Sequence, residues 1–528
     1  MALGVATNPV LHASVTSEGG GHSWTLEIYP GSNPNPGFRE RCVVEIEIPA
    51  GSGWVLIVDD ETLSSTIRGS WIWQPDFFAG RVRAELERDG KHVGHYLLDV
   101  SPDPGKLSME WYEEILGSFR NRAPDWVIGS EPGSRQWGTA GFAEDPWVQF
   151  RRLRLHAPAF LQALRAVTRG PIRSQRTTRA VVPVRRARRV DARTVRAAAA
   201  NGTLGYLCQS PSENEVDVAH ASEPLYEVPW NEEHLDGPAN RCLTALLLSL
   251  IRRARILRSA LGDRVDQDSG SGVRSGLQVR WERRRRQLDS IAAELSQMLK
   301  REPFSCVTRP EITSAGLTSI AAHPDYSRAY GAGWRATRSG IEGVDETELM
   351  WLCPTWELYE RWCYVEVCRY LERHGVQKTS ESRGARQARF TGTSRAGDTV
   401  SLYFQKKFGA KGGHASAPAF HSISRERIPD LVITVDGIER QRFAAVDAKY
   451  RASRPNILDA MASAHIYHDS LRWHGKRPDV SVLLVPAAEN VAWLEDTAFI
   501  DQECVGVAIL RPSSTADSLD AILTRLLN

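Results

Sequence analysis

The sequence predicts a multidomain α+β protein with an N-terminal β-sandwich-like domain, an α-helical middle and a C-terminal α/β domain. Three observations predict this architecture. The chain has 528 residues, whereas single hydrophobic cores stop growing near about 250–300 residues. Its 42% hydrophobic and 25% charged residues are typical of chains that fold. The apolar pattern changes along the chain from short alternating runs to helical spacing, and then to a mixture of the two.

The first segment, residues 1–105, alternates short β-type runs with turn residues. Stretches rich in Pro, Gly and Asn separate the runs, and Asp89-Gly90 is a hairpin signal. This pattern predicts a small β-sandwich with strands at 24–28, 42–48, 54–58, 81–86 and 92–100.

The second segment, residues 106–345, shows apolar spacing near 3.6 residues in four places, which predicts helices. A polar, Gly/Ser-rich break at 262–276 separates the last two. We expect an α-helical domain or connector with helices at 111–120, 148–166, 240–261 and 277–299.

The third segment, residues 346–528, mixes helical and strand patterns, which predicts a sheet between helices. A long helix opens it, and a loop rich in Gly, His and Ser follows the second strand. The expected helices are 346–373, 456–473 and 516–527. The expected strands are 389–393, 400–407, 430–435, 442–449, 480–485 and 506–510, with the loop at 409–421.

Two fragments of this segment carry candidate chemistry. Asp430 follows Pro429 and opens an apolar strand, and the next strand ends with Asp447, Ala448 and Lys449. Because strand side chains alternate between faces, Asp447 and Lys449 should project to one side. Carboxylate oxygens suit Mg²⁺, and a lysine beside them can orient an attacking water. We therefore expect Asp430 and Asp447 to be metal ligands and Lys449 to be catalytic.

A third acid is expected from the preceding helix. Glu357 and Glu366 have arginines at helical ion-pair spacing, whereas Glu360 has none. Its neighbours at i−4, i+3 and i+4 are Trp356, Cys363 and Tyr364, where an unpaired carboxylate is costly. Glu360 therefore needs a metal ion or a distant cation, which makes it the functional candidate on this helix and a third metal ligand.

Each fragment alone is unspecific, because Pro-Asp and Asp-x-Lys recur elsewhere in the chain. A structural alternative is a solvated Asp447–Lys449 strand pair, a turn residue at Asp430 and a partly exposed helix charge at Glu360. The four residue types occurring together in this order favour the functional interpretation.

This order resembles the PD-(D/E)XK nuclease superfamily and, more closely, McrC-like proteins, the nuclease subunits of modification-dependent restriction systems. Phrases outside the nuclease region are also similar, including Asp99-Val100-x-Pro102 and Gly237-Pro238-Ala239-Asn240-Arg241. His465-x-Tyr467-x-Asp469 is similar to the family's helix beyond the catalytic strand. The resemblance implies a restriction-endonuclease-like C-terminal domain and Mg²⁺-dependent DNA cleavage, with Mn²⁺ as a substitute, in anti-phage or foreign-DNA defence.

Basic clusters supply candidate DNA contacts, because arginine binds phosphate bidentately and phosphate contacts dominate nonspecific affinity. Nine arginines lie between positions 173 and 196, and a second cluster comprises Arg280 and 283–286. Only nine of the 66 basic residues are lysines, and three of them, Lys406, Lys407 and Lys411, lie near the candidate site. A solvated face or a solubilising loop is the alternative in each case. The expected nucleic-acid contacts are Arg185, Arg186, Arg188, Arg189, Lys406, Lys407 and Tyr467.

The chain lacks the Gly-x4-Gly-Lys-Ser/Thr loop of a nucleotide-driven motor. Any coupled translocation would need a separate AAA+ NTPase or helicase partner. The eight cysteines form no C-x-x-C pair, and the sequence has neither a signal peptide nor an apolar run long enough for a membrane span, so a cytoplasmic protein is expected. Two functions remain as alternatives to the endonuclease: a noncatalytic DNA-binding or assembly subunit, and a DNA repair or recombination nuclease.

Overall fold

The computed structural model describes residues 8–18, 20–47, 52–66, 69–137, 145–208, 224–269, 277–338, 349–384, 387–411, 419–438, 440–513 and 517–528. They divide into two compact units. The first unit comprises residues 1–148, 264–284 and 339–528, and the second comprises 149–263 and 285–338. The predicted multidomain α+β class is confirmed. The predicted domain boundaries at 105/106 and 345/346 stay predictions.

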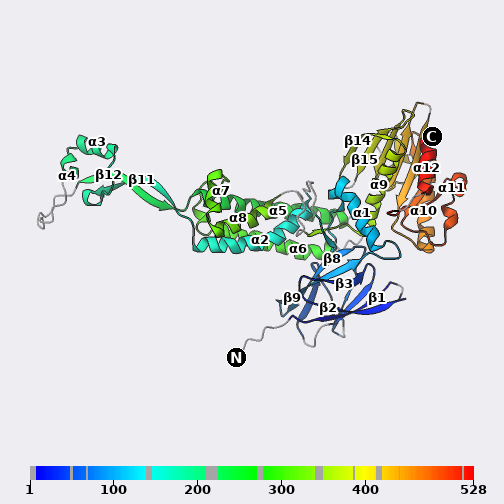
Figure 1. Ribbon diagram of the computed structural model, residues 1–528, viewed down its shortest axis with the longest axis horizontal. Coiled ribbons are helices and arrows are strands. Elements are labelled where there is room, and N and C mark those ends of the chain that lie inside the picture. The colour runs from blue at the N-terminus through cyan, green and yellow to red at the C-terminus, as the bar shows by residue number, and fades with distance from the viewer. Residues whose placement is uncertain are drawn as a thin grey trace. The chain divides into compact units, whose positions relative to one another are not determined.

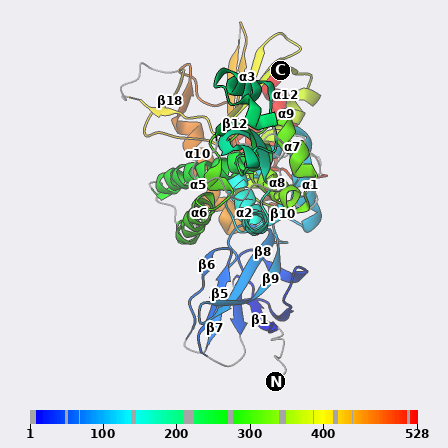
Figure 2. The ribbon, with the colours of Figure 1, turned by 90° about the vertical axis from the view of Figure 1, so that its left-hand side faces the viewer.

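The N-terminal part of the first unit consists of two sheets, whose strands β1 to β9 are drawn in blue in Figures 1 and 2. Alternate residues of both sheets, among them Val15, Ile46, Leu86 and Leu98, form one apolar core. The smaller sheet has the order β2-β1-β4-β7, with bounds β1 Leu11–Thr16, β2 Ser23–Ile28, β4 Val43–Glu47 and β7 Ser70–Trp73. The larger sheet contains β3 Pro34–Arg39, β5 Trp54–Val58, β6 Glu61–Thr62, β8 Gly80–Arg88, β9 Lys91–Ser101, β10 Ser134–Gln136 and β13 Leu349–Trp351.

The five predicted strands of this part are confirmed, and the hairpin signal is explained by backbone geometry. Asp89 and Gly90 join β8 to β9 with φ of 51° and 72°, a left-handed conformation that Gly and Asp adopt readily. Strand β3 lies where the sequence indicates only a turn, because its prolines and glycine conceal the alternation. It pairs with β9 in parallel, with an irregular register.

The C-terminal part of the first unit is a seven-stranded mixed sheet, order β14-β15-β16-β19-β20-β22-β23. The strands from β14 to β20 pair antiparallel, and β20, β22 and β23 pair in parallel. Their bounds are β14 Gln377–Arg383, β15 Ala388–Thr393, β16 Thr399–Phe404, β19 Leu431–Asp436, β20 Gln441–Ala448, β22 Val480–Val485 and β23 Val505–Ile509. A small second sheet comprises β17 Gly409–Ala410, β18 Phe420–Ser422 and β21 Leu471–Trp473.

Helices cover both faces of the seven-stranded sheet (Figure 1). One core joins α9, Thr355–Arg373, and α12, Asp517–Leu527, to residues such as Val446 and Leu484 of the sheet. The opposite core joins α10, Arg454–Ser470, to Leu483 and Val507. The remaining helices of this unit are α1 Met109–Arg122, η1 Pro124–Val127, η4 Ala492–Leu494 and α11 Thr497–Glu503.

The opening helix of this part is shorter than predicted. Helix α9 begins at Thr355, because Pro354 has ψ of 148° and lacks the backbone N–H that a longer helix would use. Leu349–Trp351 forms strand β13 instead, and residues 346–348 lie outside the described part of the chain. The prediction of a helix over 349–354 was therefore wrong.

The second unit is a helical bundle that carries a two-stranded ribbon. Helices α5 and α6 lie side by side in Figures 1 and 2, joined by an ion pair of 2.9 Å between Arg258 and Asp289. The elements that lie in or extend into this unit are α2 Pro146–Arg169, α5 Pro238–Ser269, α6 Leu277–Leu299, η3 Phe304–Cys306, α7 Ser314–Ala321 and α8 Pro324–Thr337. The predicted helices are confirmed, but α5 continues to Ser269 through the first half of the expected break.

The ribbon was not predicted. Strands β11, Ser174–Pro183, and β12, Leu225–His234, pair antiparallel, and η2 Val184–Arg186, α3 Ala192–Ala200 and α4 Leu204–Cys208 lie between them in sequence (Figure 1). Most side chains of β11 are exposed or half-buried, so it has no clear apolar alternation. The buried amide of Asn240 donates to the carbonyls of Ile172 and Leu235, just outside the two strands. This contact gives a structural reason for Asn240 at the base of the ribbon.

No helix in the described residues is long and apolar enough to cross a membrane.

Candidate active site

The candidate site lies at one end of the β19–β20 pair. The two strands pair antiparallel, with Leu431 opposite Val446, so Asp430 lies beside Asp447 at the end of the pair. Both strands are apolar and buried almost throughout, and both carboxylate side chains are nearly inaccessible. The fold therefore places two acids close together in a poorly solvated position.

Lys449 joins the two carboxylates. Its Nζ lies 2.9 Å from Oδ2 of Asp447 and 3.4 Å from Oδ2 of Asp430. Burial alone would lower the pKa of Lys449, but the two carboxylates outweigh burial and raise it. The Lys449 ammonium therefore stays charged at neutral pH. The same-side geometry predicted for Asp447 and Lys449 is present.

Asp430 has a second fixed donor. The backbone N–H of Ala448 donates to Oδ2 of Asp430 at 2.9 Å. Burial raises the pKa of Asp430 well above its usual range, and the nearby Asp447 and Glu360 carboxylates add to the rise. The site thus holds more negative charge than its neighbours neutralise.

Glu360 supplies a third acid from α9. Burial raises the pKa of Glu360 to about 8, against the opposing charge of Lys449 and with a further contribution from other carboxylates. Glu357 pairs with Arg361, and Glu366 pairs with Arg369, as the helical spacing predicts. Over the described residues, by contrast, no group forms a hydrogen bond or ion pair with the Glu360 carboxylate.

The chemistry of this donor set fits a hard divalent cation. The site offers carboxylate oxygens, which Mg²⁺ and Mn²⁺ accept, and its three acids face one ammonium, Lys449. The raised pKa values of Asp430 and Glu360 are the physical sign of missing positive charge. Within the part of the chain that is described, however, no three His, Cys, Asp or Glu side chains lie close enough together to hold a metal ion. The metal roles of Asp430, Asp447 and Glu360 therefore stay predictions.

Comparison with known proteins identifies this region. Residues 357–484 match the family model of the PD-(D/E)XK nuclease superfamily. This stretch includes most of α9, strands β19 and β20, and α10. It is a PD-(D/E)XK nuclease domain. Neither a curated protein nor a solved structure matches the chain.

Ser463 is a site residue of the nuclease domain that the sequence prediction missed. Its hydroxyl on α10 lies 2.7 Å from Oδ2 of Asp447 and 2.7 Å from the carbonyl oxygen of Ala460, so it can donate to either. The available signal was its position four residues before Tyr467, which puts both side chains on one face of the helix. A lone serine in a helix usually has no such role, so the signal was weak.

Tyr467 lies beside the same carboxylates of the nuclease domain. Its hydroxyl donates to the carbonyl of Ile428 at 3.4 Å, two residues before Asp430. Burial raises the pKa of Tyr467, and the charges of Asp447 and Asp430 raise it further. The Tyr467 hydroxyl is therefore neutral at neutral pH and lies near Asp430 and Asp447, and its contact with nucleic acid stays a prediction.

The two predicted lysine contacts differ in their surroundings. The ammonium of Lys406 lies 4.9 Å from the ring centroid of Tyr403 and 4.6 Å from that of Phe420, and burial lowers its pKa. Lys407 is exposed and pairs with Glu426 at 2.7 Å. DNA contact by either lysine stays a prediction. Lys411 is exposed, whereas His414 of the same loop lies outside the described residues.

Several side chains of the first arginine cluster form ion pairs. Carboxylates of β12 pair with Arg173 and Arg176, and Asp191 and Glu227 both pair with Arg179. The predicted contacts Arg185, Arg186, Arg188 and Arg189 lie on η2 and just after it, and all four side chains are exposed. Their exposure is compatible with phosphate binding, which stays a prediction.

Arginines of the second cluster form ion pairs with carboxylates of the same chain. Arg280 pairs with Glu131 at 3.1 Å, and Arg283 pairs with Glu85 at 2.9 Å. Arg284 is fully buried between Asp59 and Asp60. These three arginines neutralise internal carboxylates, which favours the structural alternative over phosphate contact.

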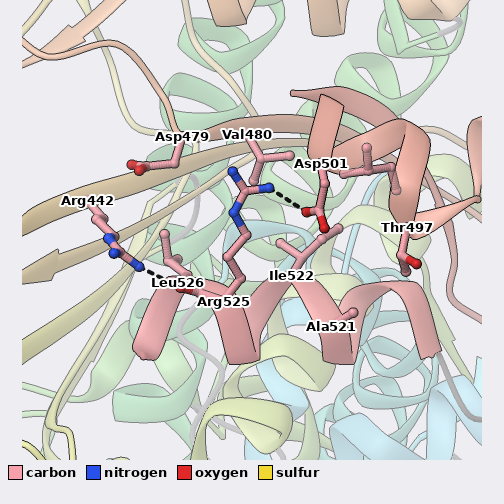
Figure 3. Close-up of a pocket in the computed structure, with 10 residues that line it drawn as sticks. Arg442, Asp479, Val480, Thr497, Asp501, Ala521, Ile522, Arg525 and Leu526 are labelled. Carbon is pink, nitrogen blue, oxygen red and sulfur yellow. Dashed lines mark hydrogen bonds and ion pairs between the residues drawn. The ribbon is translucent and has the colours of Figure 1, made fainter. Parts of the chain in front are cut away.

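A cavity of about 380 Å³ lies elsewhere in the nuclease domain (Figure 3). It opens between the ends of β20 and β22 and helices α11 and α12. Arg525 pairs with Asp501 across it, and Arg442 donates to the carbonyl of Arg525. None of the predicted site residues lines this cavity.

Proposed function

We propose that the chain is a Mg²⁺-dependent DNA endonuclease whose active site comprises Glu360, Asp430, Asp447 and Lys449. The observation that carries this proposal is that Lys449 forms ion pairs with two buried carboxylates, in a region that matches the PD-(D/E)XK nuclease superfamily. That superfamily implies phosphodiester hydrolysis. A scaffold protein would not need a lysine between two buried acids together with a third buried acid, Glu360, that has no ion-pair partner in the described residues.

Each residue has a role that follows from its chemistry. Asp430, Asp447 and Glu360 would hold the cation, which when bound supplies positive charge for the phosphate oxygens. Lys449, fixed by two carboxylates, would orient the attacking water with its N–H groups. Ser463 restricts Asp447, and Tyr467 presents a neutral hydroxyl beside them. A buried, pre-arranged set of charges loses little energy to rearrangement during the reaction.

DNA would be bound mainly through its phosphates. Arg185, Arg186, Arg188 and Arg189 expose guanidinium groups in the second unit, and Lys407 is exposed in the nuclease domain. Lys406 stacks on aromatic rings and would present a less mobile charge. These residues should contribute to affinity rather than to sequence choice.

We further propose that the protein is the nuclease subunit of a bacterial anti-phage or restriction system and works with a separate NTPase. The support is the resemblance to McrC-like proteins together with the missing nucleotide-binding loop. The second unit, with its ribbon, offers an extended surface for such a partner.

The direct test is cleavage of supercoiled, linear and single-stranded DNA, and of RNA, by the purified chain in Mg²⁺ or Mn²⁺. Asp447→Ala and Lys449→Ala should lower the rate by about 100-fold or more, because each removes a group that acts in the transition state. Asp459→Ala is the matched control, since Asp459 is an exposed acid on α10.

Cleavage that needs the metal and is lost only in the two site variants supports the proposal. Equal rates in wild type and both variants would contradict it. If the wild type cleaves none of the substrates, even when an NTPase from a neighbouring gene is added, a noncatalytic assembly subunit is favoured. A strict preference for ends or junctions would instead favour a repair or recombination nuclease.

A further inference from the structure

A buried acid outside the nuclease domain contacts the first residue of α9 and a residue that lies just after β20. Glu40 follows β3 in the N-terminal β domain, and only 3% of its surface is exposed. One carboxylate oxygen, Oε1, accepts a hydrogen bond from the hydroxyl of Thr355. The other, Oε2, accepts from the hydroxyl of Tyr450 at 3.3 Å and from the backbone N–H of Asp103 at 3.2 Å. All these groups belong to the first unit.

The two hydroxyl partners are next to the active site in sequence. Thr355 is the first residue of α9, whose next turn carries Glu360. Tyr450 directly follows Lys449 at the end of the β20 segment. Glu40 thus joins the start of the Glu360 helix to the end of the Asp447–Lys449 strand.

Packing supports the same connection. The ring of Tyr450 contacts the ring of Tyr359, the neighbour of Glu360, with centroids 6.1 Å apart. The Lys106 ammonium lies 5.1 Å from the Tyr450 centroid and pairs with Asp103 at 3.4 Å. Tyr359 and Tyr450 are almost fully buried, so neither ring has room to move without displacing its neighbours.

Burial of the Glu40 carboxylate in its charged form costs free energy. Burial raises the pKa of Glu40 to about 7, although the Thr355 hydroxyl, the Asp103 N–H and Lys106 all oppose the rise. The charged and titratable groups that face it are Lys106, Asp103, Tyr450 and, from α1, Tyr112. An apolar side chain would fill the same space without this cost, so a buried acid with three specific hydrogen-bond donors indicates a role beyond packing.

We propose that Glu40 is a positioning residue for the nuclease centre, through which the N-terminal β domain fixes Glu360 relative to Asp447 and Lys449. This inference rests on the proposed nuclease function. Glu360 comes from a different element than the other two acids, so the metal site depends on how α9 sits against the end of β20. Glu40 binds both sides of that junction.

Loss of the Glu40 carboxylate should therefore make the position of α9 relative to the end of β20 less fixed. Without it, the hydroxyls of Thr355 and Tyr450 lose their acceptor, and a displacement of about 1 Å at a reaction centre can cost about 100-fold in rate. The expected effect is weaker Mg²⁺ binding and slower cleavage, beyond what general destabilisation causes.

The test compares Glu40→Ala and Glu40→Gln with Asn35→Ala in the full chain. Asn35 is a buried hydrogen-bonding residue of the same β domain, and its amide contacts Tyr29 and Leu97, away from α9 and β20. Two quantities are measured against Mg²⁺ concentration: the rate of plasmid cleavage, and the rise in Tm caused by the metal. If Glu40→Ala fails to fold, Thr355→Val and Tyr450→Phe replace it, since each removes one hydroxyl.

In Glu40→Ala we expect the half-saturating Mg²⁺ concentration to rise about 10-fold in both measurements. Glu40→Gln, which keeps one acceptor oxygen, should recover part of the loss. Asn35→Ala should lower the metal-free Tm without changing the half-saturating concentration.

An unchanged Mg²⁺ dependence in Glu40→Ala, or the same change in Asn35→Ala, overturns the positioning role. If the wild type does not cleave DNA, the proposed function fails and the metal-induced rise in Tm alone decides the inference by the same criteria. A wild type with neither cleavage nor a metal-induced rise overturns both.

Discussion

At the scale of single residues, the candidate site is defined by a charge imbalance. Lys449 pairs with the buried acids Asp430 and Asp447, and the charge of Lys449 is also felt by a third buried acid, Glu360. Burial and the nearby carboxylates favour the protonated forms of Asp430 and Glu360, which raises the pKa of these two acids. The metal-free protein should therefore be less stable at high pH than its composition suggests.

This imbalance predicts how stability changes with pH. Burial raises the pKa of Glu360 from 4.5 to about 8, so the folded state keeps a proton that the unfolded chain releases. Between these two values the folded state binds more protons, and the free energy of unfolding falls as pH rises. Glu360→Gln should lose this part of the pH dependence and be more stable than wild type near pH 8.

The measurement is urea unfolding in EDTA at pH 5, 6, 7 and 8. Asp430 and Glu40 also have raised pKa values, so part of the slope should remain in Glu360→Gln. The same slope in variant and wild type would show that Glu360 ionises normally in the folded protein.

Sequence alone could select Glu360, because its helical neighbours offer no arginine partner. Asp430, Asp447 and Lys449 followed from strand alternation and their order in the chain. Ser463 and Glu40 could not be selected in this way. Their partners, Asp447 and Tyr450, lie 16 and 410 residues away, and no local pattern encodes such contacts.

At the scale of elements, the errors of prediction have physical causes. Helix α9 starts nine residues later than expected, because Pro354 disfavours helical backbone in the residue before it and interrupts the predicted helix. The ribbon of β11 and β12 lacks a buried face along most of its length, so it gave no alternating pattern. The buried strands β19, β20 and β22 were predicted well, because continuous apolar runs bounded by turn residues are typical of interior strands.

Helix α6 shows how a charged element can be structural. Arg284 is inaccessible, pairs with Asp59 and Asp60, and lies 4.3 Å from the ring centroid of Trp351. The run of arginines in the sequence suggests an exposed basic patch, but Arg284 is not part of any exposed surface. It neutralises two acids in the β5–β6 turn.

Arg284→Ala should destabilise the protein by about 3–5 kcal/mol, because it leaves two buried carboxylates without their main counter-charge. Urea unfolding at pH 7 measures this loss. The matched control is Arg83→Ala, which removes an exposed arginine from an ion pair with Glu85; since Glu85 keeps Arg283 as a partner, the loss should be about 1 kcal/mol or less. Equal losses in the two variants would mean that Arg284 does not carry the buried charge balance.

At the scale of the whole molecule, the chain combines a PD-(D/E)XK nuclease domain with an N-terminal β domain and a separate helical unit. The nuclease domain and the β domain belong to one compact unit, which is why an acid such as Glu40 can reach the catalytic elements. Sequence patterns predicted the class of each part. They could not predict that residues 1–148 and 339–528 share one unit, because that depends on contacts between distant segments.

The central claim is that Asp430, Asp447, Glu360 and Lys449 form a divalent-metal centre for phosphodiester hydrolysis. Calorimetric titration of Mn²⁺ into the metal-free chain and into Asp430→Asn/Asp447→Asn tests it most directly. We predict saturable binding to the wild type and its loss in the double variant, with the variant still folded by circular dichroism. Equal Mn²⁺ binding by the two proteins would contradict the claim.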